Sequence, residues 1–495
     1  MIFISTRLLT LIYVSLVFAG ENVLAEPGDV SIESREAEPS EVTDLHPRAL
    51  WPDFDPFYRN PTGLEDVAPG TIIRSRRIFP AFFGFIPDPI EAWQLLYRTT
   101  AVNGSAITTA TTIFKPLNPR KDRLVAFHTA YDSSSNICSP SYTYQLGAMP
   151  LEWITGIERL VLEAYLLSGY IVASPDYEGP DAAFAVGRLQ GKAALDGIRA
   201  VGNFADELGF SSTTPPVVGV GYSGGSIPVG WAAELQPSYA PEIDIRGWAL
   251  GGTPASLSAT LTFIDNTLYA GFAPVAINGL SKASAYGKKM NALIDRVLTS
   301  YGRAVLDAIN TVCSHQAVVL FVEQSIFSKS FQSLGLALLQ DPTIVSILDD
   351  TVLGAAKSGT PSAPVHMYHS SKDQIIPYDP ASKTAESWCA KGGNVEFVTL
   401  AAGGHVTSEP IGFPGTLRFV SDAFDGRLEL GCRRTSIFND TLDPLALALG
   451  LEPVGSRLIE LIAAVGKGDS NLSQSLEPLN VDVSWNTSIR GHGVR

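Results

Sequence analysis

Short apolar runs alternate with helical segments along the middle of this chain, and no other feature limits the possible folds as strongly. The apolar runs cover residues 123–128, 170–174, 216–222 and 245–250. Helical apolar spacing covers residues 151–169 and 188–208, and a further helix is expected to begin at Gly224. Strands that are buried on both faces read as continuous apolar runs. The alternation therefore predicts an α/β fold, with helices on both faces of a mostly parallel sheet.

The alternation stops between residues 253 and 360, where the sequence is mostly helical and rich in Ala, Leu and Ile. Strand and helix patterns return at residues 363–369, 381–390 and 395–400. We interpret the helical insertion as a cap or lid on the α/β core. The core is then predicted to comprise residues 51–252 and 361–435, and the cap residues 253–360. Residues 436–495 contain one amphipathic helical pattern, at 453–465, followed by a polar tail.

Residues 1–25 have the pattern of a secretory signal peptide. Arg7 precedes an apolar stretch at residues 8–18, and cleavage is expected after Ala19 or Ala25. Because this stretch is too short to span a hydrocarbon layer of about 30 Å, a membrane anchor is the weaker alternative. Residues 26–50 are acidic and contain prolines, as in a leader or pro-segment. We expect a secreted, extracellular protein without a transmembrane anchor.

Composition excludes two classes of protein. Hydrophobic residues make up 45% of the chain and charged residues 17%, which is far from the composition of a disordered protein. The formal net charge is −15 at pH 7. Because a negatively charged protein repels phosphates, nucleic acid is excluded as an expected partner.

The cysteines and glycosylation sequons agree with export. There are four cysteines, and an exported protein favours disulfides, but the spacing alone leaves three possible pairings open. Sequons of the N-x-Ser/Thr type occur at Asn103, Asn439, Asn471 and Asn486, whereas proline after Asn60 excludes that position.

The sharpest local motif is Gly221-Tyr222-Ser223-Gly224-Gly225, which matches G-x-S-x-G. Such a motif forms a tight strand-to-helix turn that exposes one serine hydroxyl, and Gly221 and Gly225 avoid collisions within that turn. The apolar run before the motif and the helical pattern after it supply this context. We therefore predict that Ser223 is a nucleophile.

Chain order identifies the partners of Ser223, because in this kind of fold the acid follows the serine and the histidine follows the acid. Asp373 comes just after the strand pattern at 363–369, and Asp379 is the alternative acid. Only His405 and His492 then remain as bases, and His492 lies at the extreme end of the chain. The prediction is a Ser223–His405–Asp373 triad, in which Ser223 attacks an ester carbonyl and His405 moves the proton.

Two other histidines are interpreted as structural. His366 and His369 lie within a strand pattern and have no acid at a spacing typical of a zinc site. Phosphate-binding loops and dinucleotide fingerprints are also missing from the sequence. We therefore predict neither a metal site nor a cofactor.

The negatively charged oxygen that forms during ester cleavage needs two hydrogen-bond donors, and one is expected to be the backbone N–H of Gly224. The second normally comes from the loop after an early strand, which here is residues 128–133. The HGGG form of that loop is absent. Losing one such donor costs about 2.7–4 kcal/mol, so a residue of this loop is expected to serve.

A series of motifs between residues 55 and 432 resembles the fungal secretory lipases of the Candida lipase A type. In chain order they read DPFY, YDSSS, SPDYEGPDAAF, ALDGIRA, GYSGG, YAGFAPVAINGLS, DQIIPY and CAKGGNVEF. The resemblance implies an α/β-hydrolase with a helical cap that opens at a lipid interface. It also implies the same triad, the pairs Cys138–Cys313 and Cys389–Cys432, and oxyanion donors at Asp132 and Gly224.

Asp132 is a difficult donor, because a carboxylate would repel the oxyanion. Either its backbone N–H donates, or its side chain is protonated, or Asp132 only forms the turn.

These patterns predict a secreted carboxylic-ester hydrolase, and we expect a triacylglycerol lipase whose substrate lies at a lipid–water interface. A short-chain or acetyl esterase acting on a secondary metabolite is the first alternative, because acyl length depends on groove shape and not on the triad. The second is a catalytically inactive hydrolase fold that serves as a binding module. No obligate protein partner is predicted.

Overall fold

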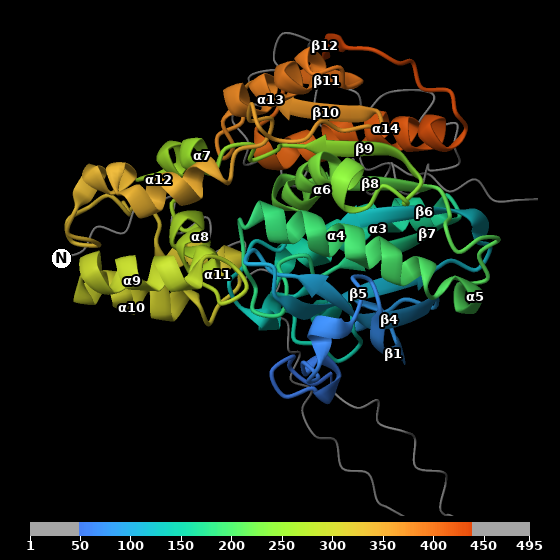
Figure 1. Ribbon diagram of the computed structural model, residues 1–495, viewed down its shortest axis with the longest axis horizontal. Coiled ribbons are helices and arrows are strands. Elements are labelled where there is room, and N and C mark those ends of the chain that lie inside the picture. Colours follow the sequence, from blue (N-terminus) through green and yellow to red (C-terminus); the bar gives the residue numbers. More distant parts are fainter. Residues whose placement is uncertain (1–48, 438–495) are drawn as a thin grey trace, which may run out of the picture. The chain divides into compact units, whose positions relative to one another are not determined.

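A ten-stranded sheet forms the centre of the computed structural model, which describes residues 49–437 (Figure 1). Its strands lie in the order β1-β4-β5-β7-β6-β8-β9-β10-β11-β12. They span β1 Ile72–Ile78, β4 Glu91–Thr100, β5 Ala106–Lys115, β6 Arg120–His128, β7 Tyr170–Pro175, β8 Val217–Tyr222, β9 Ile245–Gly251, β10 Val365–Ser370, β11 Val395–Leu400 and β12 Arg433–Ile437. A separate hairpin pairs β2 (Ala81–Phe82) with β3 (Ile86–Pro87).

The predicted mostly parallel sheet is confirmed. Strands β6 to β12 are parallel to one another, whereas β1, β4 and β5 form an antiparallel edge that the sequence patterns do not predict. This edge joins the parallel part where β5 pairs antiparallel with β7. Strand β6 shows why the apolar runs are continuous. Val125 and Phe127 pack on one face of the sheet, and Leu124 and Ala126 pack on the other.

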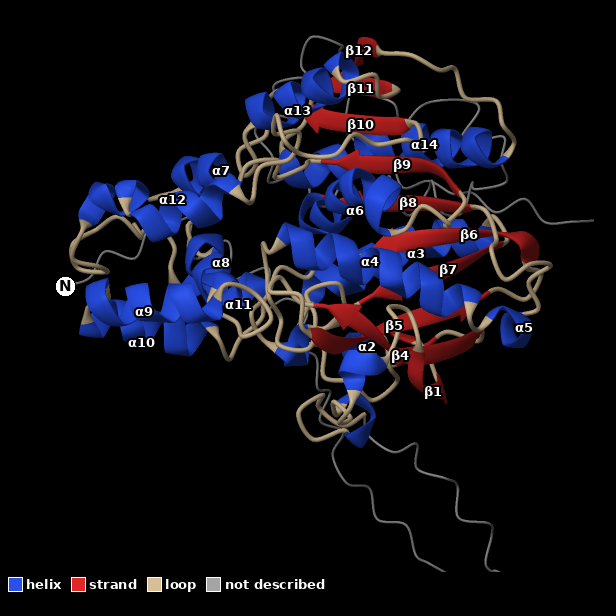
Figure 2. Ribbon diagram, viewed as in Figure 1, coloured by secondary structure: helices blue, strands red, loops and turns tan. Residues whose placement is uncertain are grey.

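Helices cover both faces of the sheet (Figure 2). The core helices are α2 Pro140–Thr143, α3 Trp153–Leu167, α4 Gly187–Gly202, α5 Ala205–Leu208, α6 Ser226–Tyr239, α13 Tyr378–Ala390 and α14 His405–Phe424. Apolar residues of α3 and α14 pack on one face of the sheet, and those of α4, α6 and α13 pack on the other.

Three helices differ from the sequence expectation. The pattern at 188–208 forms two helices, α4 and α5, and the helix expected from Gly224 is a 3-10 turn at Ser223–Gly225 followed by α6. Helix α14, which contains Pro410 and Pro414, is not among the helices expected from the sequence. Proline disfavours a helix interior, but here Phe413 and Leu417 of α14 are buried against the sheet, and tertiary packing overrides local propensity.

Further helices lie between β9 and β10, within the range expected for the cap. They are α7 Leu257–Ile264, α8 Phe272–Leu280, α9 Gly287–Val297, α10 Ser300–Ile309, α11 Ser314–Leu320 and α12 Pro342–Asp349. The arrowheads of β6, β9 and β10 point toward this side of the sheet (Figure 2). The cap therefore lies toward the carboxyl ends of the parallel strands, where α/β sheets bind ligands.

Several predicted features lie outside the described residues. These are the signal peptide, the leader up to residue 48, the helical pattern at 453–465, His492, and the sequons at Asn439, Asn471 and Asn486. Among the helices of residues 49–437, none has both the length and the apolar character that crossing a membrane requires.

Helices α4 and α6 approach so closely that a side chain on Gly191 would displace one of them. A Cβ atom on Gly191 would lie 2.7 Å from the backbone carbonyl carbon of Trp231 in α6. We therefore expect Gly191→Ala to lower the free energy of unfolding by about 1–3 kcal/mol, as overpacking does. Urea denaturation measures this change.

Gly197→Ala is the matched control on the same helix. Its Cβ would meet the side-chain oxygen of Tyr97 at 3.0 Å rather than backbone. Alanine is also the better helix former, so this variant should be nearly neutral. Equal stability of the two variants would contradict the proposed close contact.

Candidate active site

Ser223 sits on the tight turn between β8 and α6. Its φ angle is 49°, a left-handed conformation that is strained for a residue other than glycine. A Cβ on Gly221 would lie 2.2 Å from the carbonyl oxygen of Gly225, and a Cβ on Gly225 would lie 1.9 Å from that of His128. Both positions therefore require glycine, and the turn directs the Ser223 hydroxyl away from the strand.

A chain of hydrogen bonds joins three residues that are far apart in the sequence. The Ser223 hydroxyl lies 2.7 Å from Nε2 of His405, and Nδ1 of His405 lies 2.6 Å from Oδ2 of Asp373. The three residues follow β8, β11 and β10, respectively. Because carboxyl ends of parallel strands meet at one edge of the sheet, the fold brings these side chains together.

Asp373 is buried and fully hydrogen-bonded. Its Oδ1 accepts the backbone N–H groups of Ile375 and Ile376, both at 2.8 Å. Burial alone would raise the pKa of Asp373, but the neighbouring imidazoles of His405 and His369 lower it below the ordinary value. Asp373 therefore remains a carboxylate, which can accept the Nδ1–H proton of His405 in its hydrogen bond.

His405 is held by its backbone as well as by its ring. Its N–H donates to Oε1 of Gln374 at 2.9 Å, and its carbonyl accepts the hydroxyl of Tyr222 at 2.5 Å. Burial disfavours the charged imidazole, but Asp373 outweighs this effect and raises the pKa of His405 above 6.5. The ring is thus both fixed in orientation and a stronger base than a free histidine.

His369 is the site residue that the sequence analysis misses. Its Nε2 lies 3.3 Å from Oδ2 of Asp373 and 3.1 Å from the carbonyl oxygen of Ile376. The spacing of four residues between His369 and Asp373 could have revealed the contact. His366, by contrast, pairs with Glu396 at 2.8 Å, away from the triad. The alternative acid Asp379 is exposed on the first turn of α13.

Asp132 lies directly against Gly224. A Cβ on Gly224 would be only 1.5 Å from Oδ1 of Asp132, and this oxygen has no hydrogen-bond partner within the described residues. Asp132 also has a left-handed φ of 41°. Burial raises its pKa to about 7, so near neutral pH a large fraction of the side chain is protonated and can donate a hydrogen bond.

A second acid, half-buried, lies on the same helix as His405. Glu409 is one turn beyond His405 on α14, and burial raises its pKa to about 7. The charges of Asp132 and Glu409 both contribute to raising the pKa of His405. The pKa of His405 therefore depends on these two acids as well as on Asp373.

The cysteines form the two pairs that the resemblance implies, Cys138–Cys313 and Cys389–Cys432. Among the described residues, Cys138, Cys313 and Glu152 bring three potential metal-ligand atoms within 4.8 Å of one another, but both sulfur atoms are bonded in the disulfide. Asn103 lies in the exposed turn between β4 and β5, where its Oδ1 accepts the hydroxyl of Ser105 at 2.7 Å. Glycosylation of Asn103 stays a prediction.

Comparison with known proteins places this chain in a family. A family model described as secretory lipase matches residues 145–431. The secreted triacylglycerol lipase LIP1 of Malassezia furfur is 39% identical, over 76% of this chain and 77% of the relative. LIP3 of Malassezia restricta, also named a secreted triacylglycerol lipase, is 36% identical over 88% of this chain and 94% of its own.

The structure is similar to Candida antarctica lipase A in its closed state, with a TM-score of 0.76 and 31% identity over 83% of this chain and 95% of that one. The predicted α/β-hydrolase fold is thereby confirmed. A more distant likeness in fold alone is the cell-wall-degrading esterase LipA of Xanthomonas oryzae, with a TM-score of 0.52 and 17% identity over 67% of this chain and 91% of that one. On this evidence the chain belongs to the secretory lipase family.

Proposed function

We propose that the protein is a secreted triacylglycerol lipase that works through an acyl-enzyme on Ser223. Family membership makes it a carboxylic-ester hydrolase. The observation that carries the assignment of roles is the unbroken chain of hydrogen bonds from Asp373 through His405 to Ser223.

In the first half of the reaction, the Ser223 oxygen attacks the ester carbonyl while Nε2 of His405 takes its proton. The charged imidazole is stabilised by Asp373, which keeps its own negative charge. When the tetrahedral intermediate collapses, His405 returns the proton to the departing alcohol oxygen. The acyl group then remains bonded to Ser223.

In the second half, water takes the place of the alcohol. His405 removes a proton from the water as its oxygen attacks the acyl carbonyl. The Ser223–acyl bond breaks, the proton returns to Ser223, and a carboxylic acid leaves. The net reaction consumes one ester and one water and yields one alcohol and one acid.

Two groups are positioned to stabilise the oxyanion in both halves. The backbone N–H of Gly224 follows the nucleophile directly, and the protonated side chain of Asp132 lies against Gly224. Because Asp132 is buried, it can remain neutral at a pH at which an exposed aspartate would be ionised. The neutral side chain removes the repulsion that makes a carboxylate a poor oxyanion donor.

A long-chain substrate at a lipid surface is supported by apolar side chains near the triad. Val406, directly after His405, is 51% exposed. In the cap, Tyr269 accepts a hydrogen bond from Nε2 of Gln374, and its neighbour Leu268 is partly exposed. Exposed apolar side chains of this kind fit an enzyme that meets its substrate at an interface.

We also propose a role for each part of the chain. Residues 1–25 direct export, 26–50 form a leader, and 253–360 form the cap over a core of 51–252 and 361–435. Residues 436–495 follow the core, and no obligate protein partner is needed for the reaction described above.

Ser223→Ala tests the nucleophile and, with it, the alternative of an inactive binding module. We expect turnover of p-nitrophenyl esters to fall by about 10⁴-fold or more, because the acyl-enzyme cannot form. The native protein should hydrolyse long acyl chains as well as short ones. Rates measured on a series of chain lengths check this, and strict preference for acetate would favour the esterase alternative.

The pH profile tests the roles of His405 and Asp132. Below its raised pKa, His405 is protonated and cannot act as a base, so kcat/KM should fall as the pH decreases through a value above 6.5. Above about 7, Asp132 loses its proton and stops donating, so an alkaline decrease is also expected. Steady-state kinetics on a soluble ester measure both limbs.

Asp132→Asn separates the two limbs. The amide donates at every pH, so the alkaline decrease should disappear, and the acidic limb should move to lower pH because a negative charge near His405 is lost. An unchanged alkaline limb in Asp132→Asn would show that the side chain of Asp132 is not the donor, which leaves its backbone N–H or a role in the turn alone.

A further inference from the structure

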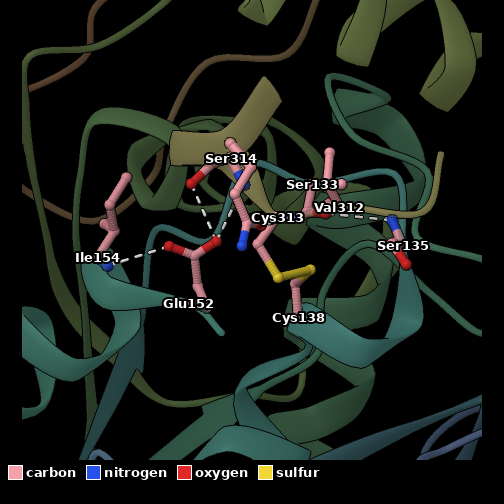
Figure 3. Close-up of a disulfide and its surroundings, with 9 residues drawn as sticks. Ser133, Ser135, Cys138, Glu152, Ile154, Val312, Cys313 and Ser314 are labelled. Atoms are coloured by element: carbon pink, nitrogen blue, oxygen red, sulfur yellow. Dashed lines mark hydrogen bonds between the residues drawn. A yellow bond between two sulfur atoms is a disulfide. The ribbon is translucent and has the colours of Figure 1, made fainter. Parts of the chain in front are cut away.

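The loop that carries Asp132 is attached to the cap as well as to the core. We call residues 131–138 the oxyanion loop and residues 310–314, from the end of α10 to the first residue of α11, the cap linker. The Ser133 hydroxyl donates to the carbonyl of Val312 at 3.3 Å, and Cys138 is bonded to Cys313 (Figure 3). Two consecutive linker residues therefore hold the loop.

Lys282, just after the end of α8, makes a third connection. Its ammonium group donates to the carbonyl of Ser134 at 2.7 Å and to Oδ1 of Asn310 at 2.6 Å. The side chain thus joins the oxyanion loop to the first residue of the cap linker. Burial lowers the pKa of Lys282, but nearby Asp181 and Glu178 favour its charged form.

Glu152, the residue before core helix α3, makes the fourth connection, and its partner is the cap linker. Its Oε1 accepts the N–H of Ile154 at 3.0 Å, which caps α3. Its Oε2 accepts the N–H of Ser314 at 3.1 Å and the hydroxyl of Ser314 at 2.9 Å, at the start of α11 (Figure 3). A single buried carboxyl group thus caps one helix of the core and one helix of the cap.

The oxyanion loop needs such restraints because Asp132 is strained. A non-glycine residue with a φ of 41° is retained only when its surroundings determine its conformation. On the core side, Glu158 accepts the N–H of Ala130 at 3.0 Å and Tyr177 donates to the carbonyl of Thr129 at 2.9 Å. On the other side, Ser133, Ser134 and Cys138 are held by Val312, Lys282 and Cys313, respectively, and Glu152 in turn holds the neighbouring Ser314. Asn136 also donates to the carbonyl of Pro180 at 2.9 Å.

We propose that Glu152 is a positioning residue for ester hydrolysis. Together with the Cys138–Cys313 bond, it holds the cap linker against the oxyanion loop and so keeps Asp132 beside Gly224. This inference rests on the proposed function. Because the oxyanion exists only in the transition state and the intermediates, loss of this restraint lowers kcat and leaves substrate binding nearly unchanged.

Glu152→Asp isolates the connection to the cap. Aspartate is a good helix N-cap, so α3 keeps its cap, but the side chain is one methylene too short to reach Ser314 as well. We expect kcat on p-nitrophenyl butyrate to fall about tenfold, with KM within about twofold of the native value. Amide hydrogen exchange in residues 131–138 should become faster.

Ser314→Ala is the milder variant, because it removes only the hydroxyl and leaves Glu152 in place. It should lower kcat by about threefold, and it keeps the test open if Glu152→Asp fails to fold. Unchanged kcat and unchanged exchange in folded Glu152→Asp or Ser314→Ala would overturn the proposal.

The second disulfide supplies a matched control. The double variant Cys138→Ser/Cys313→Ser should lose kcat, by about a hundredfold. The double variant Cys389→Ser/Cys432→Ser should lose thermal stability but keep kcat, because that bond joins α13 to the segment before β12. Assays below the melting temperatures of both variants make the comparison valid. Equal losses of kcat would mean that any missing cross-link has this effect, and the proposal would fail.

Ser223→Ala distinguishes a failure of this inference from a failure of the proposed function. If Ser223→Ala retains turnover, the proposed function itself is wrong. If Ser223→Ala is inactive while the variants of Glu152, Ser314 and Cys138–Cys313 keep the native kcat, only the positioning role is wrong.

Discussion

A serine held at a φ of 49° between a strand and a helix has almost no free space on either side. Backbone atoms lie where the side chains of Gly221 and Gly225 would be, and one of the carbonyls involved belongs to His128, at the end of β6. The turn therefore depends on the parallel pairing of β6 with β8. The same pairing places the loop after β6 next to Ser223. The position of the nucleophile and that of the oxyanion donor are thus consequences of one contact within the sheet.

Opposite environments give two aspartates opposite roles. Asp373 is surrounded by two imidazoles and two backbone N–H groups, so it keeps its charge although it is buried. Asp132 is buried with an oxygen that has no partner among the described residues, so it holds its proton to about neutral pH. The negative charge of either aspartate raises the pKa of His405. Desolvation alone would raise the pKa of both acids. The difference between their pKa values comes from their hydrogen-bond partners and neighbouring charges.

Much of this arrangement could be predicted from the sequence. The apolar runs predicted the parallel strands because each buried strand must be apolar on both faces. The fixed chain order of nucleophile, acid and base then selected Asp373 and His405. The antiparallel edge of β1, β4 and β5 did not follow from that pattern, nor did α14, whose two prolines contradict local propensity.

The missed features depend on how the chain folds around a residue, which a local pattern does not report. The contact of His369 with Asp373 needs the loop after β10 to fold back on the strand. Whether Asp132 is charged depends on how deeply it is buried, which no local motif reports. In the same way, the short sequence around Glu152 gives no sign that its carboxyl group reaches the start of α11.

The Cys138–Cys313 bond has a consequence for the cell that makes the protein. The two cysteines are 175 residues apart, so the bond forms only after the cap has been synthesised and only in an oxidising compartment. If the bond holds the oxyanion loop as proposed, a newly made chain in the reducing cytosol has its nucleophile but lacks an ordered oxyanion site. Oxidation during export would then complete the oxyanion site only after the chain has left the cytosol.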